Sequence, residues 1–274
     1  MPTDNVRFDM DFTPLQFIDE LLHLFERPTT LSLCTLSDES WSALAEEHKK
    51  RRKDHIVYTD IVSEISRLTT EVDSLKIKRF RKKNKLNYRY ERITNVSFYA
   101  RIESSDVEKR GKEMYYAKLK ELEEFLKPFP PFKKLNVLLF VDDVFDEFLQ
   151  KLEFLWKAPV EVLDTQQLDL RASWHIAVWQ IAHNPQLKRL DLCVVEDYEW
   201  LILIVKAWKT NPRDLTVLEF RQLFNEKNEV LETLKFSKTG FVSEKCRGDF
   251  DNYELRFEDS RLNVWVRNWN ALKD

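Results

Sequence analysis

The feature that most constrains the fold is a strand-and-helix unit that recurs through the second half of the chain. Four segments share mostly apolar residues at the spacing L-x-x-L-x-L: Leu135 to Phe140, Val160 to Thr165, Leu187 to Leu192 and Leu215 to Phe220. Each precedes a segment of helical spacing, through Trp156 and near 172–182, 197–208 and 226–235. The central leucines (Leu138, Leu163, Leu190 and Leu218) lie 25, 27 and 28 residues apart. A strand and a helix repeated at such a period are typical of a leucine-rich-repeat-like solenoid, whose successive parallel strands are neighbours.

The repeats depart from the regular pattern where the standard motif ends with asparagine or cysteine. This chain has Asp143, Leu168, Val195 and Leu223 there, so it has no asparagine ladder. We therefore predict an α/β fold with irregular leucine-rich-repeat-like βα units, and a non-repetitive α/β domain is the alternative. Two more strands, near 253–257 and 262–266, are expected to cover the open edge of the sheet.

The segment before the repeats shows a change of period. Steps of four and three predict an amphipathic helix over roughly 56–77, on which lie Ile61, Ile65, Leu68, Val72 and Leu75. Alternating residues then predict strands near 86–91 and 96–102, joined as a hairpin through Thr94-Asn95. A long helix follows to Leu126, where the prolines at 128, 130 and 131 end it.

The scarcity of glycine argues against several classes of enzyme. The 274 residues include only Gly111, Gly240 and Gly248. Phosphate-binding loops need clustered glycines, because the backbone must approach the ligand at positive φ. The sequence therefore argues against P-loop, Rossmann and kinase-type sites. We expect no cofactor and no catalytic residue.

Other candidate sites and compartments follow from residue spacing and charge. The five histidines, His23, His48, His55, His175 and His183, form no zinc-binding motif, so no metal site is expected. The net charge of −3 and the short apolar runs predict neither a membrane span nor strong nucleic-acid binding. Three widely spaced cysteines and a polar N-terminus favour a protein of the cytoplasm or nucleus.

The N-terminal stretch predicts three short helices. Apolar residues at helical spacing form the face of the first: Leu15, Ile18, Leu21, Leu22 and Phe25. Pro28 interrupts the chain, a second apolar patch includes Leu31 and Leu36, and Ser37-Asp38 can cap a third helix that carries Trp41. Helices this short need another surface to cover their apolar faces.

This stretch resembles an F-box, in particular the F-box and F-box-associated families of nematodes. The resemblance rests on Pro14-Leu15, Leu21-Leu22, Pro28, Leu31 and Trp41. The chain departs from the family pattern at Thr13, in a longer gap from Leu36 to Trp41, and in having Asp38 and Glu39 where basic residues are usual. An ordinary three-helix cap on the following domain is the alternative.

The resemblance implies that the chain is a non-enzymatic substrate-recognition adaptor of a Skp–cullin–F-box ubiquitin ligase. The module 1–53 would bind a Skp-type linker and thereby the cullin ligase, through Pro14, Leu15, Ile18, Leu21, Leu22, Leu31 and Trp41. Residues 54–84 would form a linking helix and basic loop, and residues 85–274 would bind a protein substrate. Outward-facing positions of the repeats give the candidate substrate surface: Asp164, Gln166, Lys188, Arg189, Asp191, Glu219 and Arg221. The alternative is an RNA- or ribonucleoprotein-binding protein that uses the basic runs 49–53 and 76–85.

Overall fold

The computed structural model describes twelve stretches of the chain: residues 15–24, 27–61, 65–69, 74–76, 90–102, 112–129, 131–141, 145–168, 170–192, 199–219, 231–244 and 248–267. The chain forms two compact units. The helical unit consists of residues 1–54 and 84–92, and the sheet unit consists of residues 55–83 and 93–274.

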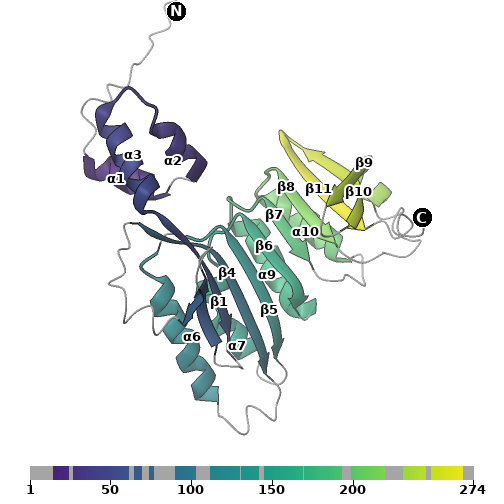
Figure 1. Cartoon of the computed structure of the whole chain (residues 1–274). Helices are drawn as coiled ribbons and strands as arrows, with labels where there is room; N and C mark the ends of the chain where they lie inside the picture. The colour runs from purple at the N-terminus through teal and green to yellow at the C-terminus, as the bar shows by residue number, and fades with distance from the viewer. Residues whose placement is uncertain are drawn as a thin grey trace, which may run out of the picture. The chain divides into compact units, whose positions relative to one another are not determined.

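The helical unit contains the three helices that the N-terminal sequence predicts: α1 (Leu15–Leu24), α2 (Arg27–Leu33) and α3 (Glu39–Arg51), drawn in purple in Figure 1. Asp38 is the N-cap of α3, because its side chain accepts a hydrogen bond from the backbone N–H of Trp41 at 3.0 Å. The capping expected of Ser37-Asp38 is thus made by the aspartate.

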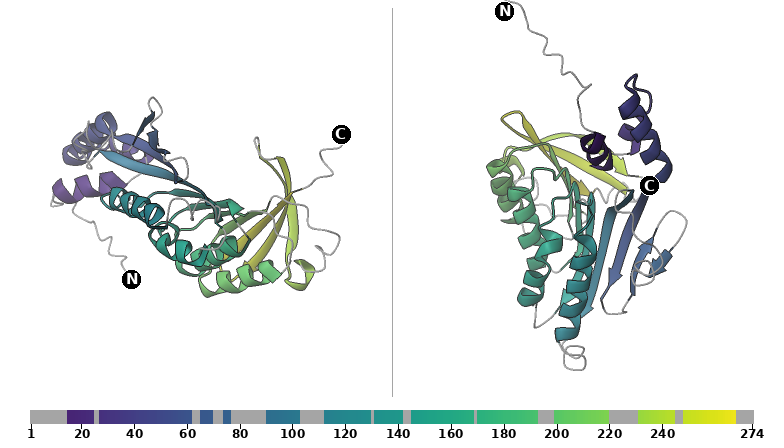
Figure 2. Two further views of the ribbon diagram at one scale, coloured as in Figure 1. Left: turned by 90° about the horizontal axis from the view of Figure 1, so that it is seen from below. Right: turned by 90° about the vertical axis from the view of Figure 1, so that its left-hand side faces the viewer.

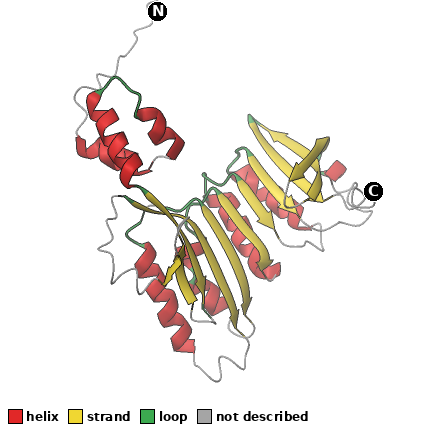
Figure 3. Ribbon diagram, in the orientation of Figure 1, coloured by secondary structure: helices red, strands yellow, loops and turns green. Residues whose placement is uncertain are grey.

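The strands join in one sheet of eleven, in the order β3-β2-β1-β4-β5-β6-β7-β8-β11-β10-β9 among the described residues. Neighbours from β4 to β8, and then β8 and β11, pair in parallel, whereas the strands at both ends of the sheet pair antiparallel. The bounds are β1 (Lys53–Asp60), β2 (Ile65–Thr69), β3 (Ser74–Lys76), β4 (Glu91–Ile102), β5 (Lys134–Val141), β6 (Val162–Leu168), β7 (Arg189–Leu192), β8 (Leu215–Glu219), β9 (Ser237–Glu244), β10 (Gly248–Phe257) and β11 (Ser260–Arg267). The predicted α/β class is confirmed (Figure 3).

The described helices of the sheet unit lie on one face of its sheet (Figure 2). They are α6 (Lys112–Leu126), α7 (Phe145–Lys151), α8 (Glu153–Trp156), α9 (Leu170–His183) and α10 (Glu199–Thr210). Alternate strand residues are buried on this face, including Phe98, Leu139, Leu163 and Leu190. The opposite, helix-free face therefore displays the residues in between.

The spacing of the parallel strands is more regular than the sequence suggests. Leu135, Leu163, Leu190 and Val217 pair in register, at intervals of 28, 27 and 27 residues. The predicted alignment through Leu138 and Leu218 is therefore wrong by three residues in β5 and by one in β8. Leucine identity alone misled the alignment, because apolar residues occur on both faces of these strands.

The prediction of a helix over 56–77 is wrong, since β1, β2 and β3 occupy this segment. The buried residues of β1 alternate (His55, Val57 and Thr59), as expected for a strand with one covered face. Of the residues whose steps of four and three suggested a helix, Ile65 and Leu68 lie in β2, Leu75 lies in β3 and Ile61 follows β1, while Val72 lies outside the described residues. β-Branched and aromatic residues in β1 were the better guide.

The predicted hairpin at Thr94-Asn95 is also wrong, because β4 runs without interruption from Glu91 to Ile102. The proposed partner strand, 86–91, falls largely on residues outside the described part of the chain. Of the helix expected near 226–235, residues 226–230 lie outside the described part of the chain, and residues 231–233 are helical.

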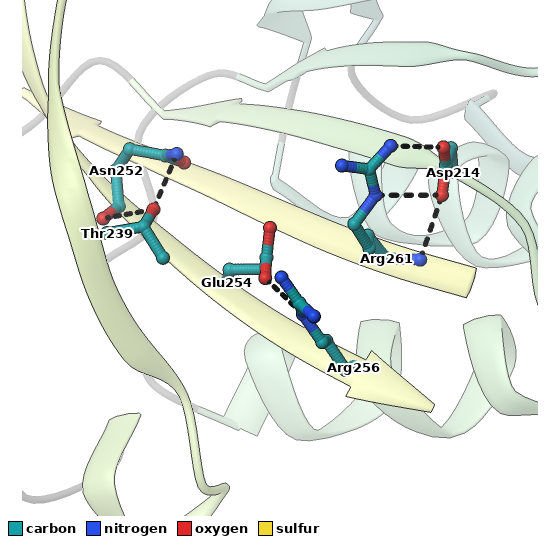
Figure 4. Close-up of polar contacts among 6 residues, drawn as sticks. All are labelled: Asp214, Thr239, Asn252, Glu254, Arg256 and Arg261. Atoms are coloured by element: carbon teal, nitrogen blue, oxygen red, sulfur yellow. Dashed lines mark hydrogen bonds and ion pairs between the residues drawn. The ribbon is translucent and has the colours of Figure 1, made fainter. Parts of the chain in front are cut away.

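The C-terminal hairpin confirms the expected closure of one sheet edge. β10 and β11 pair antiparallel, and β11 pairs in parallel with β8. Asp214, immediately before β8, accepts hydrogen bonds from Arg261 of β11: the backbone N–H at 3.0 Å, Nε at 3.5 Å and Nη2 at 2.9 Å (Figure 4). The same figure shows Asn252 of β10 donating to the hydroxyl of Thr239 in β9, which becomes the outermost strand.

Candidate protein-binding surfaces

The helical unit has a small apolar core of its own. Ile18 and Leu22 from α1 and Trp41 and Ala45 from α3 are buried together. Leu21, Leu33, Cys34 and Leu44 pack around them and are partly exposed. α1 and α3 are also joined by His48, which is buried and lies 2.8 Å from Asp19 Oδ1 through its Nε2.

Residues 90–92, far away in the sequence, complete this unit. The hydroxyl of Tyr90 donates a hydrogen bond to Glu47, and its ring contacts His48 edge-on. Arg92 donates from Nη2 to the carbonyl oxygen of Leu22 at 3.3 Å, in the last turn of α1, where helix carbonyls lack helical partners. Burial, with the neighbouring Arg52 as a second cause, lowers the pKa of Arg92 to about 10. Sequence reasoning missed these contacts, since no local pattern links residue 90 to residue 47.

Among the described residues of the helical unit, four large apolar side chains are exposed. Leu15 is 59 % exposed, Phe17 50 %, Leu31 43 % and Leu36 39 %. Single exposed leucines are ordinary, whereas exposed apolar side chains that form a contiguous patch are typical of interaction sites.

The predicted linker-binding residues divide between this surface and the core. Leu15 and Leu31 are exposed, whereas Ile18, Leu22 and Trp41 are buried in the unit itself and Leu21 is partly covered. The prediction that Ile18, Leu22 and Trp41 contact a partner directly is therefore corrected: these side chains form the core that gives the unit its shape. Pro14 lies outside the described residues. Phe17 and Leu36 were not among the predicted linker-binding residues, although Phe17 lies off the apolar stripe of α1, which was a signal for exposure.

The basic run 49–53 is largely neutralised within the helical unit. Its ion pairs are Lys49–Glu46 at 3.0 Å, Arg51–Glu47 at 3.3 Å, Arg52–Asp54 at 2.8 Å and Lys53–Glu91 at 3.7 Å. Of the second run, 76–85, only Lys76 is described. The described geometry thus offers no row of free cations to track a nucleic-acid backbone.

The second candidate surface is the helix-free face of the sheet. Parallel pairing places one residue from each strand in a cross-strand row: Ser97, Asn136, Asp164, Asp191, Leu218 and Trp265. Asn136 donates from Nδ2 to the Ser97 hydroxyl at 3.0 Å. Ile56 and Tyr58 of β1 are each 41 % exposed. Sequence analysis missed these two because it placed them on a helix.

Of the predicted substrate-binding residues, Asp164 and Arg189 are half-buried, and Asp191 is only 1 % exposed. Asp191 Oδ1 lies 2.7 Å from Nε of Arg189, whose guanidinium stands over the ring of Trp265 at 5.6 Å. The Asp191 carboxylate is therefore paired with Arg189 of the same strand and is not a surface charge. The prediction that Asp191 lies on the substrate-binding surface is therefore corrected, because an outward position on a strand does not guarantee exposure.

Among the remaining predicted residues, Lys188 and Glu219 lie outside the row of Asp164 and Asp191. Lys188 is exposed before β7 and pairs with Glu161 at 2.8 Å. Glu219 pairs with Leu192, in the row next to that of Asp191. Gln166 falls where β6 and β5 lose register, and Arg221 lies outside the described residues.

Glu161 connects the starts of three parallel strands. Its carboxylate lies 2.8 Å from Nζ of Lys188 and 3.6 Å from Nζ of Lys133. The hydrogen bond from Lys188, with a further contribution from Lys133, lowers the pKa of Glu161, although partial burial opposes the shift. The pair of charges before β6 and β7 thus reinforces the register of the repeats.

Among the described residues, no group of three or more His, Cys, Asp and Glu side chains is arranged to hold a metal ion. No helix in the described stretches is both long and apolar enough to cross a membrane. Comparison with protein-family models finds no match, and no curated protein sequence matches the chain significantly.

Proposed function

We propose that the chain is a non-enzymatic adaptor of a Skp–cullin–F-box ubiquitin ligase. The helical unit binds a Skp-type linker, and the sheet unit binds a protein substrate. The observation that carries the proposal is the division of apolar residues in the helical unit. Ile18, Leu22 and Trp41 form its core, while Leu15, Phe17, Leu31 and Leu36 remain exposed for a partner.

The sheet unit supplies the substrate-binding half of the proposal. Its successive parallel strands and one-sided helices are similar to an irregular leucine-rich-repeat-like arrangement. The helix-free face offers exposed Ile56 and Tyr58 on β1 and half-buried polar residues such as Ser97 on β4 and Asp164 on β6. Mixed apolar and polar contacts are typical of protein interfaces. An adaptor needs no reacting group, since tethering raises the effective concentration of substrate at the ligase.

The test is capture of a purified Skp-type linker by the full chain and by Leu31→Asp. Leu31 is 43 % exposed, so the substitution should leave the unit folded. A charge in the middle of an apolar interface should lower affinity by about tenfold or more. Circular dichroism would verify that the helix content is unchanged.

Leu203→Asp is the matched control, because Leu203 is equally exposed (43 %) but lies on α10 of the sheet unit. It should bind the linker as the unmodified chain does. Equal binding by Leu31→Asp and the unmodified chain, or absence of binding by the unmodified chain, would refute the proposal.

A further inference from the structure

We propose that the exposed segment from the end of α2 to the first turn of α3 docks on a partner whose apolar groove is bordered by lysine or arginine. The inference rests on the proposed function and adds the charge of the linker surface. Residues 31, 32, 35–37, 39 and 40 are exposed, and they include Leu31 and Leu36. The apolar side chains supply the contact area, and the charges beside them select the partner.

The charges beside these leucines are acidic. Between Pro28 and His48 the chain has Asp38, Glu39, Glu46 and Glu47 and neither lysine nor arginine. Glu46 and Glu47 are paired with Lys49 and Arg51 at the far end of α3. Asp38 caps the helix, and Glu39 is exposed and makes no ion pair with any described residue. The acidic charge next to Leu36 is therefore available to a partner.

The acidic charge of this segment then decides which kind of partner can bind it. A groove with an acidic rim would bring like charges together, which costs affinity and slows association, whereas a basic rim steers the partner to this segment. A second copy of the chain is disfavoured, because four of the five cations of the run 49–53 are already paired within the helical unit. Nucleic acid is disfavoured because its phosphates would meet the acidic segment.

The test compares association of the full chain and Glu39→Lys with a purified Skp-type linker at about 0.05 M and about 0.5 M salt, since salt screens exposed charges. Glu39→Lys should slow association and weaken binding about 3- to 10-fold at low salt, with a smaller difference at high salt. Glu39→Gln should give an intermediate effect. Glu123→Lys makes the same charge change at an exposed position on α6 and should have no effect.

The outcomes separate this inference from the proposed function. If Leu31→Asp abolishes binding and Glu39→Lys does not change it, the adaptor proposal stands and the charge inference fails. If Glu39→Lys binds more tightly, the rim is acidic and the inference is overturned. Sedimentation showing self-association that Glu39→Lys weakens would identify a second copy as the occupant and overturn it too. If the unmodified chain does not bind the linker, both fail.

Discussion

Trp41 stabilises the helical unit through its buried ring but also buries a hydrogen-bond donor that has no acceptor among the described residues. It is buried in the core of the helical unit beside Ile18 and Leu22. Its indole N–H is buried and has no hydrogen-bond partner in the described part of the chain. An unsatisfied buried donor costs about 1–3 kcal/mol, which offsets part of the gain from burying the ring.

Trp41→Phe should therefore change the free energy of unfolding by no more than about 1 kcal/mol, because loss of the orphan donor compensates for the smaller ring. Trp41→Ala should cost about 3–5 kcal/mol, since it leaves a cavity. Urea unfolding followed by circular dichroism measures both. Equal destabilisation by the two variants would mean that the indole N–H has an acceptor.

Asp191 shows a limit of prediction at the same scale. Alternation along the strand correctly places it in a row with Asp164 on the helix-free face. Its burial depends on Arg189 and on Trp265, which β11 brings into that row across β8. The pairing of β11 with β8 joins segments about 50 residues apart, and no local pattern encodes it.

At the scale of elements, the repeats from β5 to β8 were predictable because each combines a strand pattern with a following helix. Prolines give a clearer signal of where each strand begins. Pro131, Pro159, Pro185 and Pro212 stand four or five residues before the residues that pair in register, Leu135, Leu163, Leu190 and Val217. Proline ends the preceding helix and so marks the start of each unit. The segment of β1 to β3 has no such marker, and its period was misread as helical.

The βα segments lack an asparagine ladder, but amide side chains join adjacent βα segments elsewhere. Asn184, just after α9, donates from Nδ2 to the carbonyl oxygen of Val160 at 2.8 Å. Gln180 donates from Nε2 to the carbonyl oxygens of Trp156 at 2.6 Å and Ala158 at 3.0 Å. Both side chains are buried, so their hydrogen bonds satisfy backbone groups that water does not reach.

The ion pairs of Glu161 give an element-scale prediction of pH dependence. Its pKa is lower in the folded chain than its ordinary value of 4.5, so its contribution to stability is present above that pH and is lost as the pH falls through the folded value. Glu161→Gln should therefore be less stable at neutral pH, and its free energy of unfolding should fall less steeply with decreasing pH below about 4.5.

The measurement is denaturant unfolding of both proteins between neutral pH and about pH 3, where carboxylates titrate. Glu124→Gln, an exposed position on α6, serves as the control and should follow the unmodified chain. Parallel pH profiles for Glu161→Gln and the unmodified chain would contradict the assigned role of the ion pairs.

At the scale of the whole molecule, each of the two units has apolar residues buried within it. Leu22 is fully buried in the helical unit, so Leu22→Asp places a charge in that core and should unfold α1, α2 and α3. The core of the sheet unit contains none of the residues that this substitution disturbs. Hydrogen exchange should therefore show lost protection in Glu39–Arg51 and retained protection in Lys134–Val141 and Val162–Leu168.

Leu163→Asp is the reciprocal variant, because Leu163 is fully buried in β6. It should remove protection from the sheet unit and spare α3. If Leu22→Asp instead removed protection from both units, the chain would unfold as one cooperative body. Under the proposed function, a linker that binds the helical unit would then also stabilise the sheet unit. Loss of protection confined to one unit in each variant would mean that either unit can unfold while the other keeps its fold.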